Sequence, residues 1–123
     1  RLHLMLPLDE PEFIDRSVLP AADGQKWRDR YYAIRSSLQD PPRIMPVELG
    51  PPPKIAADKR VSPFERCNLW LLYTALAWGV DKVRFICLWN GEGGDGPGGT
   101  AHMHREVKRR TGRVTWLDTR TLW

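Results

Sequence analysis

The chain has 123 residues, of which 41% are hydrophobic and 28% are charged, and its formal net charge is +4. These values are typical of one compact domain spanning residues 1–123, and they exclude disordered and fibrous chains. No apolar run approaches the roughly 18 residues of a membrane-spanning helix and no signal peptide is visible, so we expect a cytoplasmic protein with no membrane partner.

Two cysteines, Cys67 and Cys87, lie within apolar runs. Apolar surroundings favour two buried thiols in a reducing compartment over a disulfide. The chain starts at Arg1 and passes directly into an apolar segment, which favours a piece of a longer protein.

The first part of the chain alternates between expected strands and helices. Residues 1–8 are apolar enough for a buried strand, and Pro11 allows a helix to begin near Glu12. A second helix is predicted over residues 25–38. Its large side chains recur at helical spacing and are expected to face a core; they are Trp27, Tyr31, Ile34 and Leu38.

Two proline-containing segments follow that helix. Residues 43–49 predict a short strand, whose internal Pro46 favours a sheet edge or a bulge. Residues 50–61 predict a loop, for which a plain surface crossover and a lid are the alternatives.

The next helix carries the clearest end signals in the chain. Ser62 is in the N-cap position, Pro63 opens the helix, and Glu65 completes a capping box. Gly79 is the expected C-terminal stop. The interior is apolar nearly all round, which is typical of a helix buried on more than one side.

The last third predicts a strand, a helix and a second strand. Residues 83–89 are apolar and β-branched, as in a central parallel strand covered on both faces. Thr100 is the expected cap of a helix over residues 101–111, which Gly112 ends. Residues 113–117 form the final strand. The alternation predicts an α/β fold with a mostly parallel Rossmann-like sheet of about four strands and helices on both faces.

Six of the ten glycines lie between Gly91 and Gly99, after one expected strand and before the last helix. Glycine permits positive φ and a close backbone approach, and the helix that follows points unpaired N–H groups at the loop. Such a loop favours an anion, typically phosphate. It matches neither a P-loop nor the tight dinucleotide-binding turn, so a purely structural glycine loop is the alternative.

The candidate ligand-binding residues surround this loop. Asn68, within the apolar helix, is expected either to brace the loop or to reach the ligand. His102 lies near a helix N-terminus and is placed to donate to a phosphate, whereas His104 faces another side of the helix, so no metal site is expected. The full set is Asn68, Asn90, Gly93, Gly94, Asp95, Gly96, Gly98, Gly99, Thr100 and His102.

Residues 85–118 resemble a Rossmann-like module of multidomain bacterial signalling and conflict proteins, related to the SLOG and TIR-like superfamilies. The most specific part of this resemblance is the run GDGPGGTAHM at 94–103, and two further blocks lie within residues 6–18 and 63–70. The resemblance implies a nucleotide or NAD derivative as ligand, no further cofactor, and an attached effector domain such as a TPR or protease-like domain. It also implies that this chain is the C-terminal portion of the module and lacks an upstream strand and helix.

We therefore expect a regulatory module that binds a small nucleotide-like or phosphorylated ligand, rather than a catalyst. One alternative is a TIR-like N-glycosidase or transferase acting on NAD or a nucleoside, although Glu92, flanked by glycines, is expected to be held poorly. Another is an interaction module with a vestigial pocket. Nucleic acid is not an expected partner, because the basic residues at 105–113 complement a helix C-terminus and no aromatic residues are interleaved with them.

Overall fold

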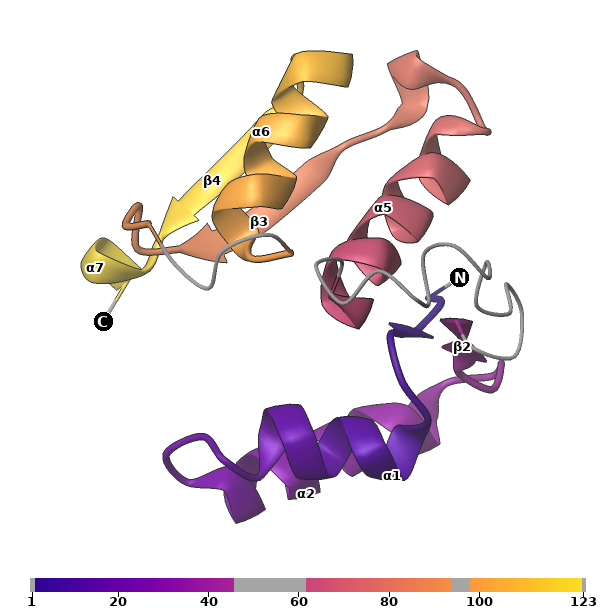
Figure 1. Cartoon of the computed structure of the whole chain (residues 1–123), viewed down its shortest axis with the longest axis vertical. Helices are drawn as coiled ribbons and strands as arrows, with labels where there is room; N and C mark the ends of the chain where they lie inside the picture. Colours follow the sequence, from indigo (N-terminus) through magenta and orange to yellow (C-terminus); the bar gives the residue numbers. More distant parts are fainter. Residues whose placement is uncertain (1, 46–61, 94–97, 123) are drawn as a thin grey trace. The chain divides into compact units, whose positions relative to one another are not determined.

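The computed structural model describes residues 2–45, 62–93 and 98–122, and the chain forms two compact units, Arg1–Ala57 and Asp58–Trp123 (Figure 1). Each unit combines helices with a parallel sheet that has two strands in the described residues, which confirms the predicted α/β class. The expected loop at 50–61 and the end of the strand expected at 43–49 lie outside the described residues. No helix in the described part of the chain is long and apolar enough to cross a membrane.

The first unit contains two very short strands and a pair of helical segments. Strand β1 (Met5–Leu6) runs parallel to β2 (Arg43–Ile44). The helix expected near Glu12 is present as α1 (Glu10–Phe13), but it continues as a π-helical turn, η1 (Ile14–Val18). The wider turn is visible in the bond from the Leu19 N–H to the Ile14 carbonyl, an i to i+5 pair at 2.9 Å.

Helix α2 (Gly24–Ser37) forms where a helix was expected, but its large side chains are less buried than predicted. Trp27 is 49% exposed and Ile34 is 59% exposed. Tyr31 of the same stripe is anchored by a polar contact, because its hydroxyl donates to the Glu10 carboxylate at 3.0 Å. The short α1 and η1 segments cover only part of the stripe, so the remainder lines an open apolar groove instead of a core.

The second unit holds the glycine-rich segment. In chain order it consists of α5 (Pro63–Leu76), η2 (Val80–Lys82), β3 (Phe85–Trp89), α6 (Thr100–Thr111), β4 (Val114–Asp118) and α7 (Thr119–Leu122). Strands β3 and β4 are parallel, with Phe85 opposite Val114 and Trp89 opposite Asp118. Because α6 connects them, this part of the chain is a βαβ unit (Figure 1).

Helix α5 begins as its sequence predicts. Ser62 is the N-cap, its hydroxyl accepts from the Glu65 N–H at 3.2 Å, and Pro63 is the first helical residue. Its end differs from the prediction, because the helix stops at Leu76 with Ala77 as C-cap. Gly79 instead has φ 114° and ψ 134°, and it precedes η2.

Helix α6 also has one correct and one incorrect end prediction. The N-cap is Gly99, and Thr100 is the first helical residue, so Thr100 does not cap the helix. Gly99 takes an extended conformation and offers no side-chain acceptor to the first turn. Gly112 ends the helix with φ 66°, as predicted, and its N–H donates to the Lys108 carbonyl at 2.9 Å.

The core of the second unit lies between α5, α6 and the sheet. Leu72 on α5 is 1% exposed and packs with Met103 and Val107 of α6. On β3, Cys87 is buried but Ile86 and Leu88 are exposed. The expectation that this strand is covered on both faces is therefore wrong for the described residues, because alternate side chains face opposite sides and only one side is packed.

Candidate functional site

A pocket of about 450 Å³ lies in the second unit, where α5, β3 and the start of α6 meet. Its described lining consists of Asn68, Leu71, Phe85, Cys87, Leu88, Gly98, Gly99, Thr100 and Met103. The polar residues of this set come from the glycine-rich turn and from α5, while the apolar ones come from all three elements. The pocket thus offers one polar end and an apolar wall.

Gly98 brings the turn against the first turn of α5. Its φ is +96°, and a Cβ at this position would lie 2.6 Å from the Glu65 backbone nitrogen. The Nδ2 of Asn68 donates to the Gly98 carbonyl at 2.6 Å. Of the two roles foreseen for Asn68, bracing the loop is the one that this hydrogen bond performs.

The N-terminus of α6 opens at this turn. Gly99 is the N-cap, and none of the described side chains caps the helix. The first N–H groups of a helix have no carbonyl partner within it, so those of the first turn are available to an acceptor from outside. Together with the positive end of the helix dipole, they form a favourable environment for an anionic group.

His102 lies in the first turn of α6 but is not among the described lining residues of the pocket. Its Nδ1 is buried and has no hydrogen-bond partner in the described structure. His104 packs against Trp89, with the ring centroids 5.6 Å apart, so the two histidines face different surroundings. No group of three metal-binding side chains forms among the residues that the structure describes.

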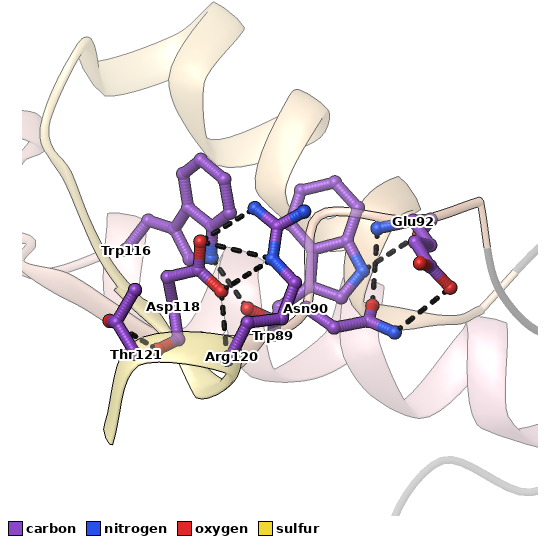
Figure 2. A network of polar contacts seen from close by, with 7 residues as sticks. All are labelled: Trp89, Asn90, Glu92, Trp116, Asp118, Arg120 and Thr121. Carbon is purple, nitrogen blue, oxygen red and sulfur yellow. Dashed lines mark hydrogen bonds and ion pairs between the residues drawn. The ribbon is translucent and has the colours of Figure 1, made fainter. Parts of the chain in front are cut away.

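Asn90 belongs to a separate cluster around the turn after β3 (Figure 2). Its Oδ1 accepts from the Glu92 N–H at 3.1 Å, and its Nδ2 donates to a Glu92 carboxylate oxygen at 3.3 Å. The Trp89 indole N–H donates to the Glu92 carbonyl at 2.9 Å. Two of these hydrogen bonds hold the backbone of Glu92 and one holds its carboxylate, and the residue is exposed.

The structure thus brings together only part of the predicted set. Asn68, Gly98, Gly99 and Thr100 line the pocket, whereas Asn90, Gly93 and His102 are outside its described lining. Gly94, Asp95 and Gly96 lie outside the described residues. The sequence missed the apolar wall, because its residues follow ordinary helix and strand patterns that indicate a core; they are Leu71, Phe85, Cys87, Leu88 and Met103.

The two cysteines provide a chemical test of burial in the second unit. Burial raises the pKa of the Cys67 thiol to about 11 and also raises that of Cys87. At pH 8 both thiols are then mostly protonated, and only the thiolate is nucleophilic. We expect an aromatic disulfide reagent to modify both slowly in the native chain and rapidly in urea, with native rates that rise with pH. Equal rates in native and unfolded protein would contradict this burial.

Replacing Asn68 tests the brace. We expect Asn68→Ala to lower the free energy of unfolding by about 1 kcal/mol, because the Gly98 carbonyl loses its donor. Asn68→Asp places a carboxylate against that carbonyl, which raises the carboxyl pKa in the folded state. A protonated carboxyl can donate, so relative to Asn68→Ala this variant gains stability as the pH falls through the raised pKa. Urea titrations at pH 7 and pH 4.5 measure this, and identical pH dependence in both variants would exclude the contact.

Comparison of the chain with models of protein families, with curated proteins and with solved structures gave no match.

Proposed function

We propose that the chain is a regulatory module that binds a small nucleotide-like or phosphorylated ligand in the pocket beside Gly98, Gly99 and Thr100. The observation that carries the proposal is the pocket itself, which opens onto the N-terminus of α6, where no described side chain caps the helix. An anionic group there accepts hydrogen bonds from backbone N–H groups and meets the positive end of the helix dipole.

The apolar wall of the pocket favours a ligand that carries an organic group in addition to its anionic group. Leu71, Phe85 and Met103 contribute carbon surface to the same pocket. Ligand sites in proteins are commonly apolar with a few convergent polar groups, and this pocket fits that description. An ester or anhydride of phosphate with an organic group suits both ends better than inorganic phosphate does.

The proposal also includes the fold: we infer that the second unit belongs to a Rossmann-like sheet. The described β3–α6–β4 segment is a parallel βαβ unit, which is the repeating block of such sheets. In these folds, ligands bind beyond the carboxyl ends of the strands, and the Gly98–Thr100 turn follows β3 on that side. A regulatory role and an attached effector domain rest on the resemblance to bacterial signalling modules. Binding in this role shifts the populations of two conformations.

The proposal is tested by calorimetric titration of the whole chain with inorganic pyrophosphate, AMP, NAD and ADP-ribose. Thr100→Glu adds a negative charge to the first turn of α6, where an acidic residue favours the helix but repels an anion. We expect this variant to fold and to lose binding. Gln25→Glu adds the same charge to the first turn of α2 in the other unit, and binding should be unchanged.

Mass spectrometry of each mixture distinguishes a sensor from an enzyme. The proposal predicts that the bound compound is recovered intact. Recovery of a cleaved nucleotide, with cleavage lost in Glu92→Gln, would instead support the N-glycosidase alternative. If Thr100→Glu and Gln25→Glu bind equally well, the ligand does not use the helix N-terminus.

A further inference from the structure

Two tryptophans and a histidine form a row of rings on the α6 side of the sheet. Trp89 is the last residue of β3, and Trp116 lies on β4 opposite Cys87. The Trp89 ring is tilted by 44° against both Trp116 and His104, with centroid separations of 5.6 Å in each case. The row therefore runs from α6 over the end of β3 to the middle of β4.

The two indole rings are fixed in place by their own N–H groups. The Trp116 Nε1 donates to the Trp89 carbonyl at 2.7 Å, and the Trp89 Nε1 donates to the Glu92 carbonyl at 2.9 Å (Figure 2). Trp116 is nevertheless 42% exposed. A tryptophan held in one orientation loses little conformational entropy when a flat ligand stacks on it.

Polar groups flank the exposed indole. Asp118 accepts from the Arg120 Nε at 2.9 Å, and the guanidinium of Arg120 also lies against the turn at Gly91. Gly91 has φ +81°, and a Cβ there would lie 3.0 Å from Trp116, so glycine lets the turn pass close to the ring. Glu92 accepts from Asn90 and keeps acceptor capacity, because a carboxylate has about four lone-pair sites.

We propose that Trp89 and Trp116 form a stacking site for the base of a purine nucleotide, with the Glu92 carboxylate as an acceptor for ribose hydroxyls. This inference rests on the proposed function and deepens it by naming the ligand class. A purine presents the planar face that an indole stacks on, and a ribose presents the hydroxyl donors that a carboxylate accepts.

The spacing between this row and the pocket fits such a ligand. Cys87 lines the pocket and lies two residues before Trp89, so the two side chains share a face of β3, roughly 7 Å apart along the strand. His104, in contact with Trp89, is four residues after Thr100, about 6 Å along the axis of α6. A base on the tryptophans and a phosphate at the helix N-terminus are thus separated by about the span of one nucleoside.

The test is calorimetric titration of the whole chain with AMP, adenosine and pyrophosphate. We expect Trp116→Ala to weaken AMP binding by about five-fold to 150-fold, the range of one base stacked on an aromatic ring, with pyrophosphate binding unchanged. Trp116→Phe keeps a stacking face and should retain most of the AMP affinity. Trp78, the 76% exposed tryptophan beyond α5, serves as the matched control, and Trp78→Ala should bind like the wild type.

The outcomes separate this inference from the proposed function. An unchanged ratio of AMP to pyrophosphate affinity in Trp116→Ala would overturn the stacking site and leave the anion site standing. Binding of adenosine without pyrophosphate would support the stacking site and contradict the anion site, and binding of none of the three would overturn both. If Trp116→Ala does not fold, the indole N–H resonances of wild-type protein decide, because AMP must shift those of Trp89 and Trp116 and leave that of Trp78 in place.

Discussion

Replacing Gly98 by alanine is expected to destabilise the second unit by about 3 kcal/mol. The backbone of Gly98 has φ +96°, which is costly for any residue with a Cβ. The new methyl group would also lie 2.6 Å from the Glu65 nitrogen, inside the first turn of α5. Backbone atoms cannot move aside as a flexible side chain can. Urea denaturation followed by circular dichroism measures the loss.

Gly93 provides the matched control for this variant. A Cβ at Gly93 meets no atom of the described residues within 4 Å, and its φ is not in the left-handed region. We expect Gly93→Ala to change the free energy of unfolding by less than about 0.5 kcal/mol. Equal stability of the two variants would contradict the close contact between the glycine-rich turn and α5. A larger side chain at Gly98 accordingly tests folding, and ligand binding is better tested at Thr100.

Leu72→Ala is the second substitution with a large expected effect, a loss of about 3 kcal/mol. Leu72 is 1% exposed and packs against Met103 and Val107, which is 0% exposed. Truncation removes this apolar contact and leaves a cavity between two helices that cannot close completely. The same denaturation experiment measures it.

Leu71 is the neighbouring control for Leu72. Its side chain is exposed and lines the pocket, outside the packed cluster. Leu71→Ala should therefore cost less than about 1 kcal/mol. If Leu71→Ala destabilises the chain as much as Leu72→Ala does, then α5 does not pack on the core through the face that carries Leu72.

Local signals predicted the ends of several helices. The Ser62 hydroxyl and the Glu65 N–H that it caps are three residues apart, so the chain itself brings them together. Gly112 ends α6 for an equally local reason, since glycine takes φ 66° without strain from a Cβ. At the other end of α6 the local signal was misleading, because Gly99 takes the N-cap position that Thr100 was expected to fill.

The sequence did not predict features that depend on contacts between distant segments of the chain. Helical spacing showed that Trp27 and Ile34 share a stripe on α2, but not whether anything covers it, and both are exposed. The bond from Asn68 to Gly98 joins residues 30 positions apart, so the sequence left two roles open for Asn68. The contact of Trp89 with Trp116 depends on the register of β3 and β4, which the glycine-rich segment does not encode.

The most direct test of the central claim is the melting temperature of the whole chain with and without AMP. A ligand that binds only the native state at about 100 times its dissociation constant adds about 2.7 kcal/mol of stability, which is a shift of several degrees for a domain of this size. We predict such a rise for the wild type and for Gln25→Glu, and none for Thr100→Glu. An unchanged melting temperature of the wild type at saturating AMP, pyrophosphate, NAD and ADP-ribose would contradict a phosphate-binding pocket at the start of α6.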